Sequence, residues 1–209
     1  LAVARPQAVV PVPRAAGTVI LAFDVSNSMS AEDVAPSRLA AAQSAALSFV
    51  QAQPDTVDIG VLAFNQGALT THMPTNDHAE TVAAINRLTV AGGTSLGQAI
   101  IASLAAIVGQ SVSLPDPSSD APPPDLGYWG SATIVLLSDG EDTGGPDAVA
   151  AAELAAAAGV HIESVGVGTI EGATIEVDGY QIATSLNEEL LIQVAEATTG
   201  SYHRAEDAQ

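Results

Sequence analysis

The sequence predicts an α/β fold: a three-layer, doubly wound (Rossmann-like) and mostly parallel sheet with one antiparallel edge strand and helices on both faces. Unbroken apolar runs, such as residues 19–23, are typical of strands that are buried on both faces of a parallel sheet. Segments with helical periodicity alternate with these runs, and this order requires right-handed crossovers between parallel strands. A short, hairpin-like connection at residues 65–67 joins the strands expected at 57–64 and 68–73, which places an antiparallel strand at the edge.

Local signals predict the remaining elements. Residues 36–53 have the apolar spacing of a helix with one buried face. Residues 173–184 alternate around Asp178-Gly179 and indicate a β-hairpin. Pro146 fits the first turn of another helix. The other elements expected are helices over residues 77–88, 95–108, 146–159 and 187–199, and strands over residues 18–24, 132–138, 160–167 and 201–204.

One domain accounts for the chain, because 209 residues fit a single α/β unit with a full hydrophobic core. We expect this domain at residues 18–209. Three prolines in residues 1–17 break any helix, so this segment is interpreted as an extended lead-in that follows a membrane anchor. Residues 109–130 carry five prolines and are interpreted as a surface insertion that acts as a spacer. A peptide-docking role for residues 122–124 is the alternative.

Composition excludes several classes of function. The net charge is −19 and the five basic residues are all arginines, so the chain cannot neutralise the phosphates of nucleic acid or adhere to an anionic membrane surface. A cation or a basic partner suits this charge better, although most acidic residues are expected to form a solvated surface. Without cysteine, neither disulfides nor a thiolate zinc site can form.

Membrane attachment is expected only through segments outside this sequence. No apolar run is long enough to cross a bilayer. Because the first residue is Leu1 rather than Met, we expect a fragment or a processed form, with any signal peptide or anchor lying outside it.

Oxygen-bearing side chains follow the first predicted strand. Asp24 ends this strand, and Ser26 and Ser28 come two and four residues later. This spacing directs three oxygen atoms into one small volume at the edge of the sheet, and such ligands suit Mg²⁺, Mn²⁺ or Ca²⁺. In the alternative interpretation, the two serines only cap the next helix.

Two later segments extend the pattern. Thr94 lies in a glycine-rich turn before a helix, and Asp139 ends the strand expected at residues 132–138. The five residues Asp24, Ser26, Ser28, Thr94 and Asp139 resemble, in order and context, the metal-ion-dependent adhesion site of von Willebrand factor A domains. The resemblance implies that this α/β fold holds a divalent cation, with Mg²⁺ favoured over Mn²⁺ or Ca²⁺, as a protein-binding module that is not an enzyme.

The ligand set also predicts what the cation binds. A cation that is held chiefly by neutral hydroxyl groups stays electron-poor and keeps an open position, so it favours an incoming Asp or Glu carboxylate. Partner carboxylates are how the resembled family binds its protein ligands. Asn27 stands where that family commonly has glycine, and asparagine tolerates left-handed backbone better than most residues.

A narrower resemblance covers almost the whole chain apart from the proline-rich insertion. Residues 1–7, 31–39, 166–169, 186–190 and 199–205 are similar to the bacterial, membrane-anchored A-domain proteins of the aerotolerance (Bat) type. This similarity implies a soluble domain that is flanked by membrane helices and faces outside the cytoplasm. It further implies a role in assembly or maturation of envelope proteins, with other membrane A-domain proteins and a MoxR-type AAA ATPase system as partners.

Two other readings stay open. In an enzyme of the haloacid dehalogenase phosphatase type, an aspartate also ends the first strand, but Ser26 replaces the second aspartate and the chain has no lysine for phosphoryl transfer. Serine hydrolysis is disfavoured because no histidine has an evident place beside Ser26 or Ser28. A structural domain whose metal site is vestigial is the third reading.

Overall fold

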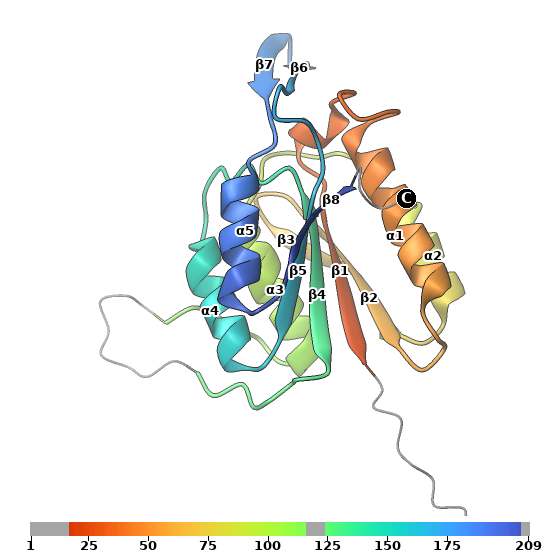
Figure 1. The fold of residues 1–209 in the computed structure, drawn as a ribbon, viewed down its shortest axis with the longest axis vertical. Coiled ribbons are helices and arrows are strands. Elements are labelled where there is room, and N and C mark those ends of the chain that lie inside the picture. Colours follow the sequence, from red (N-terminus) through yellow and green to blue (C-terminus); the bar gives the residue numbers. More distant parts are fainter. Residues whose placement is uncertain (1–16, 116–123, 206–209) are drawn as a thin grey trace, which may run out of the picture.

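A computed structural model describes residues 17–115 and 124–205, and its centre is one mixed β-sheet (Figure 1). The strands lie in the order β3-β2-β1-β4-β5-β8. Strand β3 pairs antiparallel with β2, and the other pairs are parallel. Both the mostly parallel sheet and its antiparallel edge are therefore confirmed. The strands are β1 (Thr18–Asp24), β2 (Asp58–Phe64), β3 (Ala68–Thr75), β4 (Ala132–Ser138), β5 (His161–Gly166) and β8 (Tyr202–Arg204).

Helices cover both faces of this sheet and form three layers with it. Helices α1 (Arg38–Ala52) and α2 (His78–Ile85) lie on one face, and α3 (Leu96–Val108), α4 (Ala148–Ala157) and α5 (Glu188–Ala197) lie on the other. Successive residues of β1 point to opposite faces: Ile20 packs in the core under α3, and Leu21 in the core under α1. Each face thus has its own hydrophobic core.

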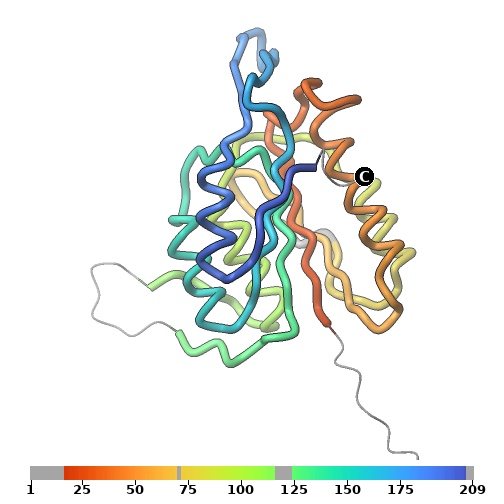
Figure 2. Tube along the Cα trace, viewed as in Figure 1, coloured from red at the N-terminus to blue at the C-terminus, as the bar shows by residue number. Residues whose placement is uncertain are grey.

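Strand β1 is central, which explains its unbroken apolar sequence. Residues 20–24 are at most 1% exposed. From β1 the chain builds outward to β2 and β3 on one side, and then returns to β4, which lies on the other side of β1 (Figure 2). Strand order therefore reverses between β1 and β4, and ligands of doubly wound sheets bind at the carboxyl ends of strands at such a point.

A separate two-stranded hairpin extends beyond this edge of the sheet (Figure 2). Strands β6 (Ala173–Val177) and β7 (Tyr180–Thr184) pair antiparallel through the Asp178-Gly179 turn. Both turn residues have positive φ, 51° and 81°, as the Asp-Gly sequence predicts. The hairpin contacts the short helix η1 (Asn27–Ser30), which follows β1.

One local prediction is wrong. Pro146 does not lie in the first turn of α4, because that helix begins at Ala148. Asp147 has non-helical dihedral angles, and its carboxylate accepts a hydrogen bond from the Ala150 N–H at 2.8 Å. An aspartate cap satisfies a free N–H of the first turn, so it defines the helix start in place of the proline.

The outer segments are described only in part. The described residues of the insertion, 109–115 and 124–130, contain neither helix nor strand. The lead-in lies outside the described residues apart from Gly17, so its extended form and the domain boundary at Thr18 stay predictions.

Candidate metal centre

The turn after β1 positions the first three candidate ligands. Asp24, Ser26 and Ser28 are 0%, 2% and 6% exposed. The Ser26 N–H donates to Asp24 Oδ1 at 2.8 Å, and the hydroxyl oxygens of Ser26 and Ser28 lie 2.9 Å apart. The Ser26 side chain does not cap η1, and α1 is capped by Ser37. The interpretation of Ser26 and Ser28 as helix caps is therefore wrong.

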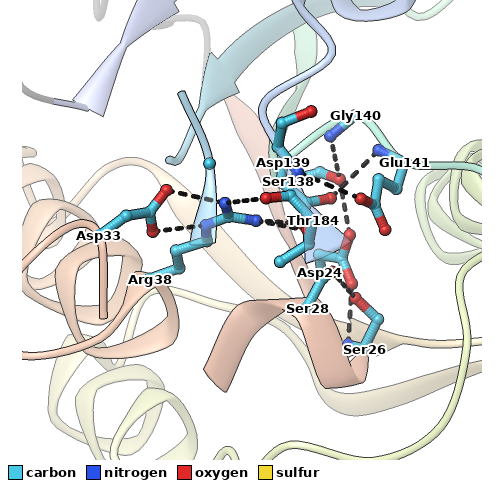
Figure 3. Close-up of polar contacts among 12 residues, drawn as sticks. Asp24, Ser26, Ser28, Asp33, Arg38, Ser138, Asp139, Gly140, Glu141 and Thr184 are labelled. Carbon is cyan, nitrogen blue, oxygen red and sulfur yellow. Dashed lines mark hydrogen bonds and ion pairs between the residues drawn. The ribbon is translucent and has the colours of Figure 1, made fainter. Parts of the chain in front are cut away.

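The end of β4 brings the second carboxylate beside the first (Figure 3). Ser138 Oγ donates to Asp24 Oδ2 at 2.6 Å and accepts from the Gly140 N–H at 3.0 Å. Asp139 is fully buried, and its Oδ1 accepts a hydrogen bond from the Glu141 N–H at 3.1 Å. The two strand ends thus form one polar cluster at the switch point, where the strand order reverses between β1 and β4.

Thr94 lies in a third loop that is tied to both of these segments. The Asn27 N–H donates to the Gly92 carbonyl oxygen at 2.8 Å, which joins this loop to the turn after β1. The Thr143 N–H donates to the Thr94 carbonyl oxygen at 3.1 Å, which joins it to the loop after β4. Thr94 is 2% exposed. All five predicted residues therefore lie on three mutually bonded loops at one edge of the sheet.

Arg38 completes the cluster, and it was missed as a functional residue from the sequence. Its side chain is fully buried, and its Nη1 donates to Asp139 Oδ2 at 2.8 Å. On the other side, Nε and Nη2 each donate to one Asp33 carboxylate oxygen at 2.8 Å. One signal for this role was available in the sequence. Arg38 lies on the apolar face of a predicted helix, and the chain has only five basic residues and a net charge of −19.

Burial disfavours the negatively charged form of Asp24, because no positively charged group among the residues that the structure describes compensates the loss of water around its carboxylate. Desolvation, together with the nearby charge of Asp139, raises the pKa of Asp24 to about 7 despite the hydrogen bonds from Ser138 and Ser26. Burial also raises the pKa of Asp139, although a hydrogen bond from Ser28 and the charge of Arg38 oppose this shift. Two buried carboxylates that are not fully compensated are the electrostatic environment that a divalent cation would stabilise.

The donor chemistry fits a hard cation. In the described part of the chain, no three His, Cys, Asp or Glu side chains gather in a way that could hold a metal ion. The candidate site instead combines two carboxylates with the hydroxyls of Ser26 and Ser28, and the buried Thr94 lies on the loop bonded to both segments. An all-oxygen set of this kind suits Mg²⁺, Mn²⁺ or Ca²⁺ better than softer metals.

The raised pKa of Asp24 predicts a pH effect on the cation-free domain. Aspartate ordinarily titrates near 3.8, so between about pH 4 and pH 7 the folded state binds more protons than the unfolded state. The free energy of unfolding should therefore fall as pH rises through this range. In chelator, we expect the melting temperature of the wild type to fall relative to that of Asp24→Asn between about pH 5 and pH 8. Thermal unfolding checks this, and parallel curves would contradict it.

Residues 93–97 read Gly-Thr-Ser-Leu-Gly, which matches the Gly-x-Ser-x-Gly pattern of a hydrolase nucleophile elbow. Ser95 is fully buried, and its Oγ accepts a hydrogen bond from the Gln98 N–H at 3.4 Å as the cap of α3. An elbow requires a strand directly before the serine, and residues 86–94 contain none. The match therefore reflects a helix cap.

A doubly wound sheet with an oxygen-lined cluster at its switch point defines a class of α/β ligand-binding domains. The chain belongs, within this class, to the von Willebrand factor type A domain family, whose sequence model matches residues 19–141. The family resemblance predicted from the five-residue pattern is confirmed. Domains of this kind are generally interaction modules without enzymatic activity, and they often bind a divalent metal.

Relatives place the chain more narrowly. An aerotolerance-related membrane protein from Bacteroides fragilis is 28% identical, with a TM-score of 0.75 and 92% of each chain covered. BatB from Bacteroides thetaiotaomicron is 30% identical, with a TM-score of 0.72 and 90% of this chain and 89% of that chain covered. The predicted likeness to the Bat group is therefore confirmed.

Curated relatives are longer than this chain. A UPF0353 protein from Mycolicibacterium vanbaalenii is 35% identical in an alignment that covers 96% of this chain and 58% of the relative. The chain thus spans little more than half the length of the curated relatives it matches. Within the described residues, no helix is both long and apolar enough to cross a membrane.

Proposed function

We propose that this domain is a cation-dependent protein-binding module. Asp24, Ser26, Ser28, Thr94 and Asp139 hold a divalent cation, with Mg²⁺ as the first candidate and Mn²⁺ or Ca²⁺ as alternatives. The observation that carries the proposal is the meeting of three bonded loops, which carry these five buried residues, where the strand order reverses between β1 and β4.

The cation is completed by an Asp or Glu carboxylate of a partner protein. Three of the five ligands are neutral hydroxyls, and the charge of Asp139 is shared with Arg38 at 2.8 Å. A cation that receives so little negative charge from the protein retains its attraction for a further anionic ligand. The domain performs no chemistry on this partner and acts by binding alone.

The relatives support a membrane setting for the domain. The structural relative from Bacteroides fragilis is a membrane protein, and much of the length of the curated relatives lies outside the matched region. We therefore place the domain at the cell membrane, facing outside the cytoplasm and attached through segments beyond this sequence. Its partners are proteins of envelope assembly or maturation, including other membrane A-domain proteins and a MoxR-type AAA ATPase system.

Manganese tests the proposal directly, because the paramagnetic Mn²⁺ ion relaxes the protons of any water that occupies its open coordination position. We expect calorimetric titration of the chelator-stripped domain to show one Mn²⁺ site. Bound Mn²⁺ should enhance water-proton relaxation through an exchangeable water, and acetate should displace this water. Acetamide, which has the same shape but no charge, serves as the matched control. Absence of Mn²⁺ binding would refute the metal site, and equal effects of acetate and acetamide would refute carboxylate recognition.

A further inference from the structure

The β6–β7 hairpin depends on its base for its position. Its two strands pair only with each other, and an isolated two-stranded hairpin is marginally stable in water. Its outer part is exposed, with Tyr180 73% and Ile182 46% exposed. By contrast, Thr184 at the end of β7 is 4% exposed. Besides the contact of β6 with η1 and the burial of Ile175, which is 9% exposed, the contacts of the base therefore hold the hairpin to the domain.

Asp33 and Arg38 supply side-chain contacts of the base, in addition to the backbone bond from the Leu186 N–H to the Thr169 carbonyl oxygen at 2.9 Å. The backbone N–H and the hydroxyl of Thr169, which precedes the hairpin, donate to Asp33 Oδ2 at 2.9 and 3.0 Å. Arg38 Nη1 donates to Thr184 Oγ1 at 2.9 Å. Gly168 packs directly against the guanidinium, since a Cβ there would lie 2.8 Å from Arg38 Nε. The segment that enters the hairpin, at Thr169, and the segment that leaves it, at Thr184, thus both hydrogen-bond to the Asp33–Arg38 ion pair.

The same arginine nitrogen reaches the candidate metal centre. Arg38 Nη1 bonds to Asp139 Oδ2 at 2.8 Å as well as to Thr184 Oγ1 (Figure 3). A guanidinium is planar, and Asp33 holds the other side of this one through two bonds of 2.8 Å. Because the group is fully buried, it cannot exchange these partners for water. A displacement of Thr184 must therefore change the position of Asp139, and the reverse holds too.

We propose that Arg38 is a positioning residue that couples the cation site to the β6–β7 hairpin. This inference rests on the proposed function, because it requires a cation at Asp139. A cation that fixes Asp139 also fixes Arg38 and thereby the base of the hairpin. By thermodynamic reciprocity, an attached hairpin strengthens cation binding by the same factor. The exposed side chains of Tyr180 and Ile182 then have a defined position relative to the occupied site and offer a second contact for its protein ligand.

Hydrogen exchange of the hairpin amides, with Mn²⁺ as the probe, tests the coupling. In the wild type, we expect Mn²⁺ to slow exchange in residues 173–184 by about 5-fold or more. Thr184→Val keeps the side-chain shape but removes the hydroxyl that accepts from Arg38 Nη1 at 2.9 Å, and leaves the longer bond from Nη2 to the Thr184 carbonyl oxygen at 3.5 Å. It should speed hairpin exchange in chelator and weaken Mn²⁺ binding by about 3-fold or more. Thr174→Val is the matched control, because Thr174 is an exposed hairpin residue, and it should change neither quantity.

A second variant separates coupling from folding. Lysine at position 38 keeps the charge but cannot bond Asp33, Asp139 and Thr184 together. In Arg38→Lys, we expect Mn²⁺ to bind without slowing hairpin exchange. If Arg38→Lys does not fold, Thr184→Val still decides the question. Mn²⁺ binding to the wild type with unchanged or faster hairpin exchange would overturn the coupling alone. No Mn²⁺ binding to the wild type would overturn both the coupling and the proposed function.

Discussion

Replacing Asp24 with asparagine is expected to abolish cation binding while leaving the fold intact. Asparagine preserves the shape of the side chain. Its Oδ1 can still accept from the Ser26 N–H, and its Nδ2 can donate to Ser138 Oγ. It removes one of the two charges of the proposed site. Loss of a residue that merely supports a metal ligand costs up to about 100-fold in affinity, so loss of a charged ligand should cost at least about that much. Calorimetric titration with Mn²⁺ measures the change.

The controls for this result are built into the chain. Asp139→Asn should also lose cation binding, since Asp139 supplies the other charge. Asp55→Asn should bind Mn²⁺ as the wild type does, because Asp55 is exposed in the turn before β2 and makes no side-chain hydrogen bond in the described part of the chain. Circular dichroism establishes that each variant is folded. Undiminished Mn²⁺ binding in folded Asp24→Asn and Asp139→Asn would refute the assignment of the site.

Arg38→Ala is expected to have the largest effect on stability. The arginine is fully buried and pairs with Asp33 and Asp139, whose side chains are 6% and 0% exposed. Its removal leaves two largely buried carboxylates without the positively charged guanidinium that pairs with them. Breaking a buried ion pair in this way costs about 3–5 kcal/mol. Denaturant unfolding in chelator measures the loss of free energy of unfolding.

Arg87→Ala is the matched comparison for this loss. Arg87 is exposed, and substitutions at such positions change stability by about 0.5 kcal/mol or less. A loss in Arg38→Ala as small as that in Arg87→Ala would show that the buried network does not stabilise the domain. Partial restoration of stability by Arg38→Lys would show how much of the loss arises from charge alone.

Sequence reasoning reached most of the fold, because the fold depends on local patterns. The apolar run of β1 reflects burial on both faces, and the Asp-Gly turn of the hairpin reflects a backbone that those residues favour. The candidate site could also be predicted, since four of its residues end or follow strands that a doubly wound topology brings to one edge, and Thr94 lies in a glycine-rich turn before a helix. The placement of Asp24 beside Asp139 required only that β1 and β4 be neighbours.

The role of Arg38 was not accessible in the same way. Its partners Asp139 and Thr184 lie 101 and 146 residues away in the sequence, so no local spacing relates them. Thr169 and Thr184 at the base of the hairpin likewise contact the network around Arg38 across long sequence separations. Local patterns can also be ambiguous. Pro146 and Asp147 are both residues that favour a helix start, and the structure uses Asp147 as the cap.

The three loops of the candidate site meet only after β1 and β4 have paired, so an unfolded chain offers the cation no assembled site. An ion that binds only the folded domain raises its free energy of unfolding by about 2.7 kcal/mol at a concentration 100 times the dissociation constant. The ionic supply of the surroundings would then govern how long the domain survives proteases. Scarcity of the ion would shorten its lifetime even with no partner present.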